Sequence, residues 1–325
     1  MDGSIGANGA GGPPGGPGAT PASYSAPVQS GVRDPSKDAI VVCVYGPSKY
    51  GKSTALIYAA PCAKLAAQEG ALRPSLRVVG HTPKNVVINT IPQATKIIRE
   101  TDPREADVVA LDDLSLLADN TVSKYVGAGK TGYDLWGAMR ESLIGLRRAA
   151  REAGIHVILN AHEGAPRDFR GAPLRGGPKL PGSMAEDLPA ACDVVLRAVY
   201  EPGRKGWPVC YRCTPSDTNY ISGDRNGVTP DKAPMNLREI LRLAGINLRR
   251  APGREWMDDA VVWASGFLLA NAAEQEPAIL NHVVGVLRSK GIGDLDIRWV
   301  IRDSLDRAVL TRAMSNPLAA FGVTL

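Results

Sequence analysis

The residues from Gly46 to Thr54 combine glycines, a lysine and hydroxyls in a spacing suited to holding a polyphosphate. Glycines let backbone amides curl around a phosphate, and a helix that begins there adds its partial positive charge. Lys52 is expected to reach the β- and γ-phosphates, and the Ser53 hydroxyl to ligate Mg²⁺. The segment therefore predicts a binding loop for ATP and Mg²⁺. It matches the pattern G-x4-G-K-[ST] and reads Gly46, Pro47, Ser48, Lys49, Tyr50, Gly51, Lys52, Ser53, Thr54.

A second contact to magnesium is predicted at the end of the apolar run at 107–113, DVVALDD. A buried strand that lies beside the strand of the loop and ends in a carboxylate can hold Mg²⁺ through water. Asp112 is the expected ligand, in the role of a Walker B carboxylate, and the alternative is that it only caps the following turn. Asp113 is the candidate for orienting the attacking water.

A polar sequence follows the next apolar run, which covers 155–163 and ends in Asn-Ala-His-Glu. In a parallel sheet, this strand is expected to end near the γ-phosphate, where a polar side chain can sense that group. His162 is the candidate for this role. The alternative is an ordinary structural histidine.

Two stretches that follow these strands mix basic and aromatic residues, and both are predicted to be loops. Basic groups interleaved with aromatics suit single-stranded nucleic acid, whose phosphates are neutralised and whose bases stack. The alternative is a pair of solvated loops. The candidates for contact are Lys124, Tyr125, Lys130 and Tyr133 in 118–134, and Arg167, Arg170, Arg175 and Lys179 in 163–183.

Alternating apolar strands and helical segments predict an α/β fold with a mostly parallel sheet covered on both faces. A helix is expected from Lys52 to about Leu65, and others near 92–100 and 134–153, the last ending at Gly154. Strands are expected at 76–80, 86–90, 107–113, 155–163 and 192–200, and before the phosphate-binding loop.

The ends of the chain differ from this central region. Residues 1–35 are rich in Gly and Pro and are expected to be disordered. We place a nucleotide-binding core at 36–248 and a helical region with solvated charged faces at 249–325. Its amphipathic segments lie near 256–273, 277–290 and 295–313.

The composition favours a soluble protein of a reducing cytoplasm. Hydrophobic residues make up 44% and charged residues 22% of the 325 residues, and no apolar run is long enough to span a bilayer. Cys210 and Cys213 form a lone C-x-x-C pair without the second pair that a zinc site needs, so both are expected to be core cysteines.

Residues 38–246 resemble the phage-type RecA-like ATPases, a group that includes single-strand-annealing recombination proteins. The resemblance rests on the phosphate-binding loop, VVALDDLS, the strand that ends in AHE, residues 176–198, and YISGDRNGV at 220–228. It implies a RecA-like P-loop core that works on single-stranded DNA as a homo-oligomeric ring or filament, with ATP at the subunit interfaces.

The resemblance also implies roles for further residues. Arg225 matches a basic residue that reaches the γ-phosphate of a neighbouring subunit, but Gly223 stands where a lysine is usual, which favours slow hydrolysis. The two basic stretches occupy the positions of the family's DNA-binding loops. The resulting hypothesis is an ATPase of phage recombination, repair or replication. The rivals are a ring helicase or helicase loader, and an assembly or regulatory protein with little turnover.

Overall fold

The computed structural model describes residues 39–68, 83–165, 175–201, 209–213, 220–225, 227–271 and 276–315. The predicted tail at 1–35 and the predicted strand at 76–80 lie outside these ranges. The described elements belong to one compact unit, residues 34–325. No described helix combines the length and the apolar character that a membrane span requires.

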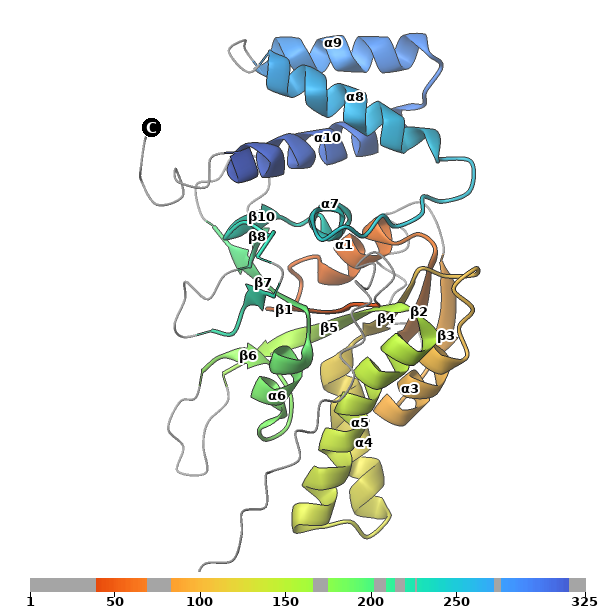
Figure 1. Ribbon diagram of the computed structural model, residues 1–325, viewed down its shortest axis with the longest axis vertical. Coiled ribbons are helices and arrows are strands. Elements are labelled where there is room, and N and C mark those ends of the chain that lie inside the picture. The colour runs from red at the N-terminus through yellow and green to blue at the C-terminus, as the bar shows by residue number, and fades with distance from the viewer. Residues whose placement is uncertain are drawn as a thin grey trace, which may run out of the picture. The chain divides into compact units, whose positions relative to one another are not determined.

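A mostly parallel sheet forms the centre of the fold, with the strand order β10-β8-β7-β1-β5-β4-β2-β3. The six strands from β7 to β3 in this order pair in parallel, while β8 and β10 extend the sheet in antiparallel fashion (Figure 1). The predicted fold class, an α/β fold with a mostly parallel sheet, is therefore confirmed. The strands are β1 Val41–Gly46, β2 Ala63–Ala67, β3 Lys84–Val87, β4 Val108–Asp112, β5 His156–Gly164, β6 Gly177–Pro178, β7 Val194–Tyr200, β8 Val209–Arg212, β9 Gly223–Asp224 and β10 Lys232–Pro234.

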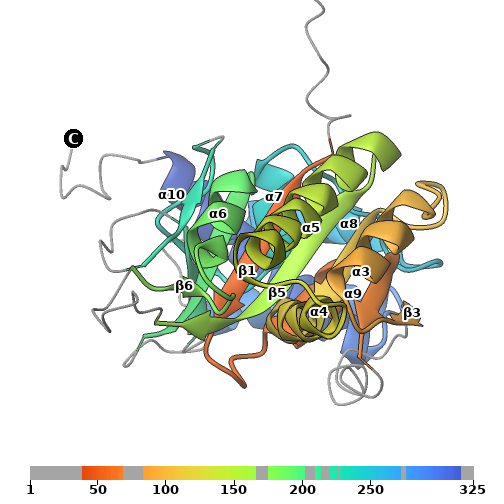
Figure 2. The same ribbon diagram turned by 90° about the horizontal axis from the view of Figure 1, so that it is seen from below.

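Helices cover both faces of the sheet (Figure 1), and Figure 2 looks onto the face that α3, α4, α5 and α6 cover. Alternate residues of β1 point to opposite faces, so Cys43 packs in a core with α3, α4, α5 and α6, whereas Val44 packs in a second core with α1 and α7. The helices are α1 Lys52–Ala59, α3 Ile91–Arg99, α4 Leu114–Gly127, α5 Gly132–Ala153, α6 Met184–Ala191, α7 Leu237–Leu243, α8 Trp256–Ala270, α9 Glu276–Ser289 and α10 Asp294–Ser315.

Three sequence predictions about the core need correction. The helix expected to reach Leu65 ends at Ala59, because Pro61 cannot continue it, and the alanine-rich segment after it forms β2. The strand expected at 86–90 is the short, largely exposed edge strand β3. The strand that ends in Asp112 is not adjacent to β1, because β5 lies between them.

The largest correction concerns residues 118–134, which we expected to form a loop. Residues 118–127 belong to α4, and α5 begins at Gly132, so only a short turn joins the two helices. The glycines and lysines that suggested a loop cluster at this turn. The stretch is therefore a helical hairpin, and its apolar positions pack against the sheet.

The C-terminal segments form α8, α9 and α10, as predicted, but their charges are not all solvated. Asp303 and Asp306 of α10 are buried. Asp303 accepts a hydrogen bond from Asn236 Nδ2 at 2.8 Å and pairs with Arg250 at 2.8 Å. The expectation of solvated faces was wrong here, because a carboxylate can be buried where a hydrogen-bond donor and a cation lie beside it. The domain boundary at 248 stays a prediction.

Candidate functional site

The loop after β1 has the backbone conformation that its glycines predict. Gly51 adopts φ 79° just before α1, in the left-handed region that favours glycine. A Cβ at Gly46 would lie 2.8 Å from Cβ and from the carbonyl oxygen of Ala198 on β7. Any side chain at Gly46 would therefore push β7 away from the loop.

Lys52 begins α1 and folds back over this loop. Its ammonium donates to the carbonyl oxygens of Gly46 at 2.9 Å and Pro47 at 2.8 Å, and the residue is 7% exposed. Burial lowers the pKa of Lys52, and the nearby Asp112 and Asp113 oppose that effect. Because both hydrogen-bond acceptors of this buried ammonium among the described residues are neutral carbonyls, its positive charge is available to an anion in the loop.

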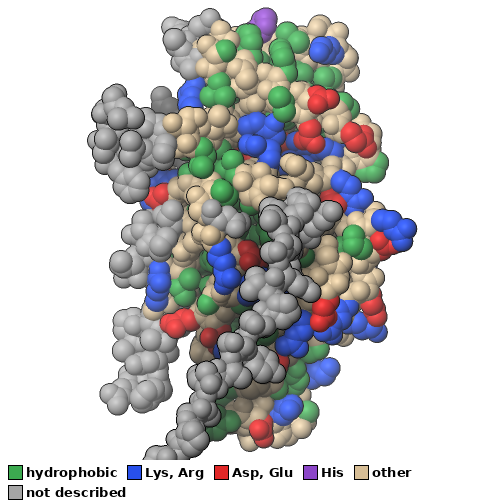
Figure 3. All heavy atoms as spheres, viewed as in Figure 1, with side chains coloured by type: hydrophobic (Ala, Val, Ile, Leu, Met, Phe, Trp, Pro, Cys, Tyr) green, Lys and Arg blue, Asp and Glu red, His purple; other side chains and the backbone are tan. Residues whose placement is uncertain are grey.

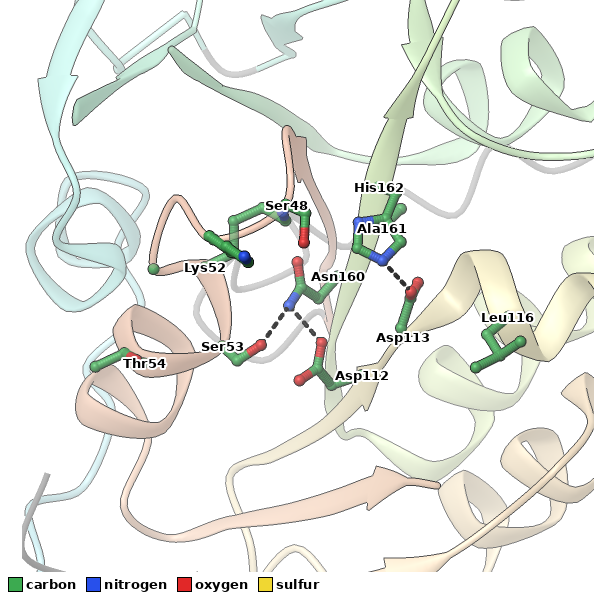
Figure 4. Close-up of a pocket in the computed structure, with 12 residues that line it drawn as sticks. Ser48, Lys52, Ser53, Thr54, Asp112, Asp113, Leu116, Asn160, Ala161 and His162 are labelled. Atoms are coloured by element: carbon green, nitrogen blue, oxygen red, sulfur yellow. Dashed lines mark hydrogen bonds and ion pairs between the residues drawn. The ribbon is translucent and has the colours of Figure 1, made fainter. Parts of the chain in front are cut away.

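Asp112, Asn160 and Ser53 meet at the carboxyl edge of three neighbouring strands. Asn160 Nδ2 donates to Asp112 Oδ1 at 2.5 Å and to Ser53 Oγ at 3.4 Å. Burial raises the pKa of Asp112, against the hydrogen bonds from Ser53 and Asn160. Asn160 Oδ1 has no hydrogen-bond partner among the described residues, and Figure 4 shows it turned toward Ser48.

Asp113 and His162 form a second pair beside this cluster. Asp113 Oδ1 accepts from the backbone amide of Ser115 at 2.8 Å and caps α4, so the capping role considered for Asp112 falls to its neighbour. Asp113 Oδ2 lies 2.7 Å from His162 Nε2. The backbone amide of His162 also donates to Ser115 Oγ at 3.0 Å. Both side chains border the same pocket as Lys52 (Figure 4).

This pocket has a volume of about 420 Å³ and is lined by residues of the loop, β4 and β5. Its polar groups suit a nucleotide phosphate with Mg²⁺: one ammonium, the amides of a helix N-terminus, a serine hydroxyl and a buried carboxylate. The orphaned oxygen of Asn160 shows that hydrogen-bonding capacity in the pocket is left unused. The described residues contain no group of three or more His, Cys, Asp or Glu side chains that could hold a metal by themselves. A cation here would therefore complete its coordination with phosphate and water.

The sequence analysis did not select Asn160, although it lies two residues before His162 in the same polar sequence. It also did not select the ion pair between Arg197 Nε and Glu163 Oε2, 2.9 Å long, at the same edge of the sheet. The Arg197 guanidinium stacks on the Tyr220 ring, 3.1 Å from its centroid. The sequence had pointed to this strand through His162, but only the strand order, in which β5 separates β1 from β4, places Asn160 between Ser53 and Asp112.

The predicted DNA-contact residues fall in different places. Tyr125 of α4 hydrogen-bonds Ser142 of α5 at 2.7 Å, and Lys130 lies 5.9 Å from the centre of the Tyr125 ring. Tyr133, at the start of α5, is 98% exposed. Lys124 is exposed on the last turn of α4.

The second predicted stretch is only partly described. Arg167 and Arg170 lie outside the described residues. Arg175 is exposed and donates through Nε to the carbonyl of Tyr220 at 3.1 Å. Lys179 is also exposed, and its amide donates to the carbonyl of His162 at 2.7 Å. Contact of either stretch with DNA stays a prediction.

Arg225 does not lie at the pocket of its own chain. Its backbone amide donates to the carbonyl of Asp193 at 3.0 Å, and its guanidinium donates to the carbonyl of Ala190. Asp193 precedes β7 and accepts from the amide of Val41, the first residue of β1. Arg225 is therefore at the opposite end of the strands from the phosphate-binding loop, which follows Gly46.

Comparison with known proteins places the central region in a family. Residues 38–225 match the family described as the AAA domain, so the chain belongs to this family of P-loop proteins. The crystal structure of the RadB recombinase is similar at 16% identity and a TM-score of 0.35, over 53% of this chain and 86% of that one. No match was found among curated proteins. The family assignment confirms a P-loop nucleotide-binding domain.

Proposed function

We propose that this protein binds ATP with Mg²⁺, hydrolyses it, and acts on single-stranded DNA in phage recombination, repair or replication. One observation carries the catalytic part of the proposal. Lys52 and Ser53 of the loop, Asp112 of β4 and His162 of β5 border one pocket, although they are far apart in the sequence. The family assignment supports the same activity.

Each side chain has a role that its position supports. Ser53 and Asp112 would hold Mg²⁺, which supplies charge neutralisation for the phosphates. Lys52 exchanges its two carbonyl partners for phosphate oxygens and stabilises the negative charge that develops there. Asp113 is an acceptor that can orient water, and His162, in contact with it, can report whether the phosphate is present.

The direct test is the rate of ATP hydrolysis without nucleic acid, with single-stranded DNA and with duplex DNA. We expect turnover that depends on Mg²⁺ and increases most with the single strand. Turnover unaffected by DNA would reject the DNA part of the proposal. Nucleotide binding without turnover would favour a structural role for ATP, a reading that Gly223 supports because it replaces the lysine usual in the resembling family.

The proposal includes a homo-oligomer in which Arg225 reaches the pocket of a neighbouring subunit. Its distance from the pocket of its own chain supports action across an interface. Arg225→Ala and Lys52→Ala should each hydrolyse ATP poorly, and their mixture should recover part of the activity. The recovery comes from interfaces that pair an intact Lys52 with an intact Arg225. A monomeric protein with a fully active Arg225→Ala variant would contradict this arrangement.

A further inference from the structure

A groove of about 610 Å³ lies between α3 and α5, away from the nucleotide pocket. The two helices pack against each other, and the turn between α4 and α5 closes one end of the groove. The hydrogen bond between Tyr125 and Ser142 lies in its lining. Arg148 lies six residues after Ser142 along α5, which is about 9 Å at 1.5 Å per residue. The groove is therefore long enough for a short stretch of extended polymer.

The charge of the groove is predominantly positive. Its lining includes four exposed cations, Lys96, Arg99, Lys130 and Arg148, against two carboxylates, Glu100 and Glu141. Figure 3 shows Lys and Arg side chains gathered over α3 and α5. Two of the cations have partners on the surface: Lys96 lies 3.7 Å from Glu100, and Arg99 lies 3.2 Å from Glu152. Exposed pairs of this kind contribute little to stability, so a polyanion can replace them.

The groove is connected to the nucleotide pocket through one helix. Asp113, which contacts His162, caps the start of α4, and Tyr125 lies near the end of the same helix. A change in the Asp113–His162 contact would therefore shift α4, and α4 carries Tyr125 in the lining of the groove. Beyond Lys130, the fully exposed ring of Tyr133 offers a surface on which a base can stack.

We propose that the groove between α3 and α5 binds the phosphate backbone of single-stranded DNA, with Lys96, Arg99 and Arg148 as phosphate contacts. This inference rests on the proposed function, because it assigns the DNA a further contact surface on the same protein. It places part of the DNA-binding surface on α3, a helix that none of the predicted loops includes. Charge complementarity and the neighbouring tyrosines favour nucleic acid over an acidic protein.

The test is the salt dependence of binding to a fluorescently labelled single-stranded oligonucleotide, measured by anisotropy with the full chain. The double variant Lys96→Ala/Arg148→Ala should bind more weakly. Each lost phosphate contact lowers the log–log slope by about 0.7, so the slope should fall by about 1.4. The matched control is Lys290→Ala/Arg298→Ala, which removes two exposed cations, one just after α9 and one in α10, and should keep the parent slope.

The outcomes separate this inference from the proposed function. If the parent binds DNA and the double variant has the same slope and an unchanged melting temperature, the groove assignment is wrong and the proposed function stands. If the parent binds no DNA, the groove assignment and the DNA part of the proposed function are both wrong. If the double variant loses binding to labelled polyglutamate but keeps the DNA slope, the groove serves an acidic protein, which also overturns the proposal.

Discussion

Two clusters of buried polar side chains differ in how their charged groups are paired within the protein. At the nucleotide pocket, Lys52 is held only by backbone carbonyls, and Asn160 Oδ1 has no partner among the described residues. At α10, Asp303 is paired with Asn236 and Arg250. Nearby, the fully buried Glu239 receives two hydrogen bonds of 2.8 Å from Arg307.

Burial is unfavourable for the charged groups of both clusters, but the two clusters compensate for it in different ways. The C-terminal cluster pairs its buried carboxylates with arginines, which joins α10 to α7 and to the segment before α8, whereas the buried Lys52 at the pocket makes no ion pair with the described residues. At the pocket, the Lys52 ammonium and Asn160 Oδ1 can form further hydrogen bonds, which a ligand would use. A buried charge without an ion-pair partner among the described residues thus distinguishes the pocket from the C-terminal cluster. Substitutions at the pocket should therefore change activity, and substitutions in the C-terminal cluster should change stability.

The largest expected effect is on stability, from Arg250→Ala. Removal of Arg250, which is 7% exposed, leaves the fully buried carboxylate of Asp303 without its cation. Breaking a buried pair from one side costs about 3–5 kcal/mol in the free energy of unfolding. Urea denaturation measures this loss. Arg288→Ala, which breaks the exposed pair with Asp294, is the control and should cost about 0–1 kcal/mol. Equal losses in the free energy of unfolding would contradict the claim that the buried pair contributes more to stability than the exposed pair.

Next in size is the loss of turnover in Lys52→Ala, with little loss of stability. Removal of one group that stabilises transition-state charge lowers kcat by about 10²–10³-fold. Single-turnover ATP hydrolysis measures the effect, and thermal melting checks the fold. Lys84→Ala is the control, because it removes an exposed lysine of β3 that does not line the pocket. A Lys52→Ala variant with parental turnover would refute the assignment of the pocket.

A smaller, pH-dependent effect is expected from Asp306→Asn. Burial raises the pKa of Asp306 from 3.8 to about 6, so the folded protein favours the neutral acid. The parent therefore loses stability as the pH rises from about 4 to about 6, whereas asparagine cannot ionise. Above pH 6, the variant should be more stable than the parent by up to about 3 kcal/mol, the free energy of about two pKa units. Denaturation between pH 4 and 7.5 tests this, and a pH-independent difference would contradict it.

The parts of the site that could be predicted from the sequence are those that depend on short, continuous stretches of the chain. Gly46 to Thr54 needs only a strand, a turn and a helix in succession, and all three are adjacent in the chain. Asp112 and His162 were found because each ends a continuous apolar run, and parallel strands bring such ends to one edge of the sheet. The helices α3 and α5 were also predicted, from their apolar spacing and, for α5, from Gly154 at its end.

The predictions that failed concern elements whose structure depends on contacts between residues distant in the sequence. β2 is Ala63–Ala67, with three alanines that favour a helix, and only its pairing with β4 and β3 makes it a strand. No local pattern showed that β5 lies between β1 and β4, so Asn160 was overlooked. The basic residues of 118–134 were read as a loop from composition alone, and their placement on a helical hairpin beside α3 required the packed structure.

The central claim is that the pocket at the end of β1 binds a nucleotide with magnesium. Isothermal titration of ATP into the parent protein, with Mg²⁺ and with EDTA in its place, tests it most directly. We expect one site per chain, with affinity that falls in EDTA and falls further in Asp112→Asn when Mg²⁺ is present. The absence of ATP binding in Mg²⁺ by a folded parent protein would contradict the account.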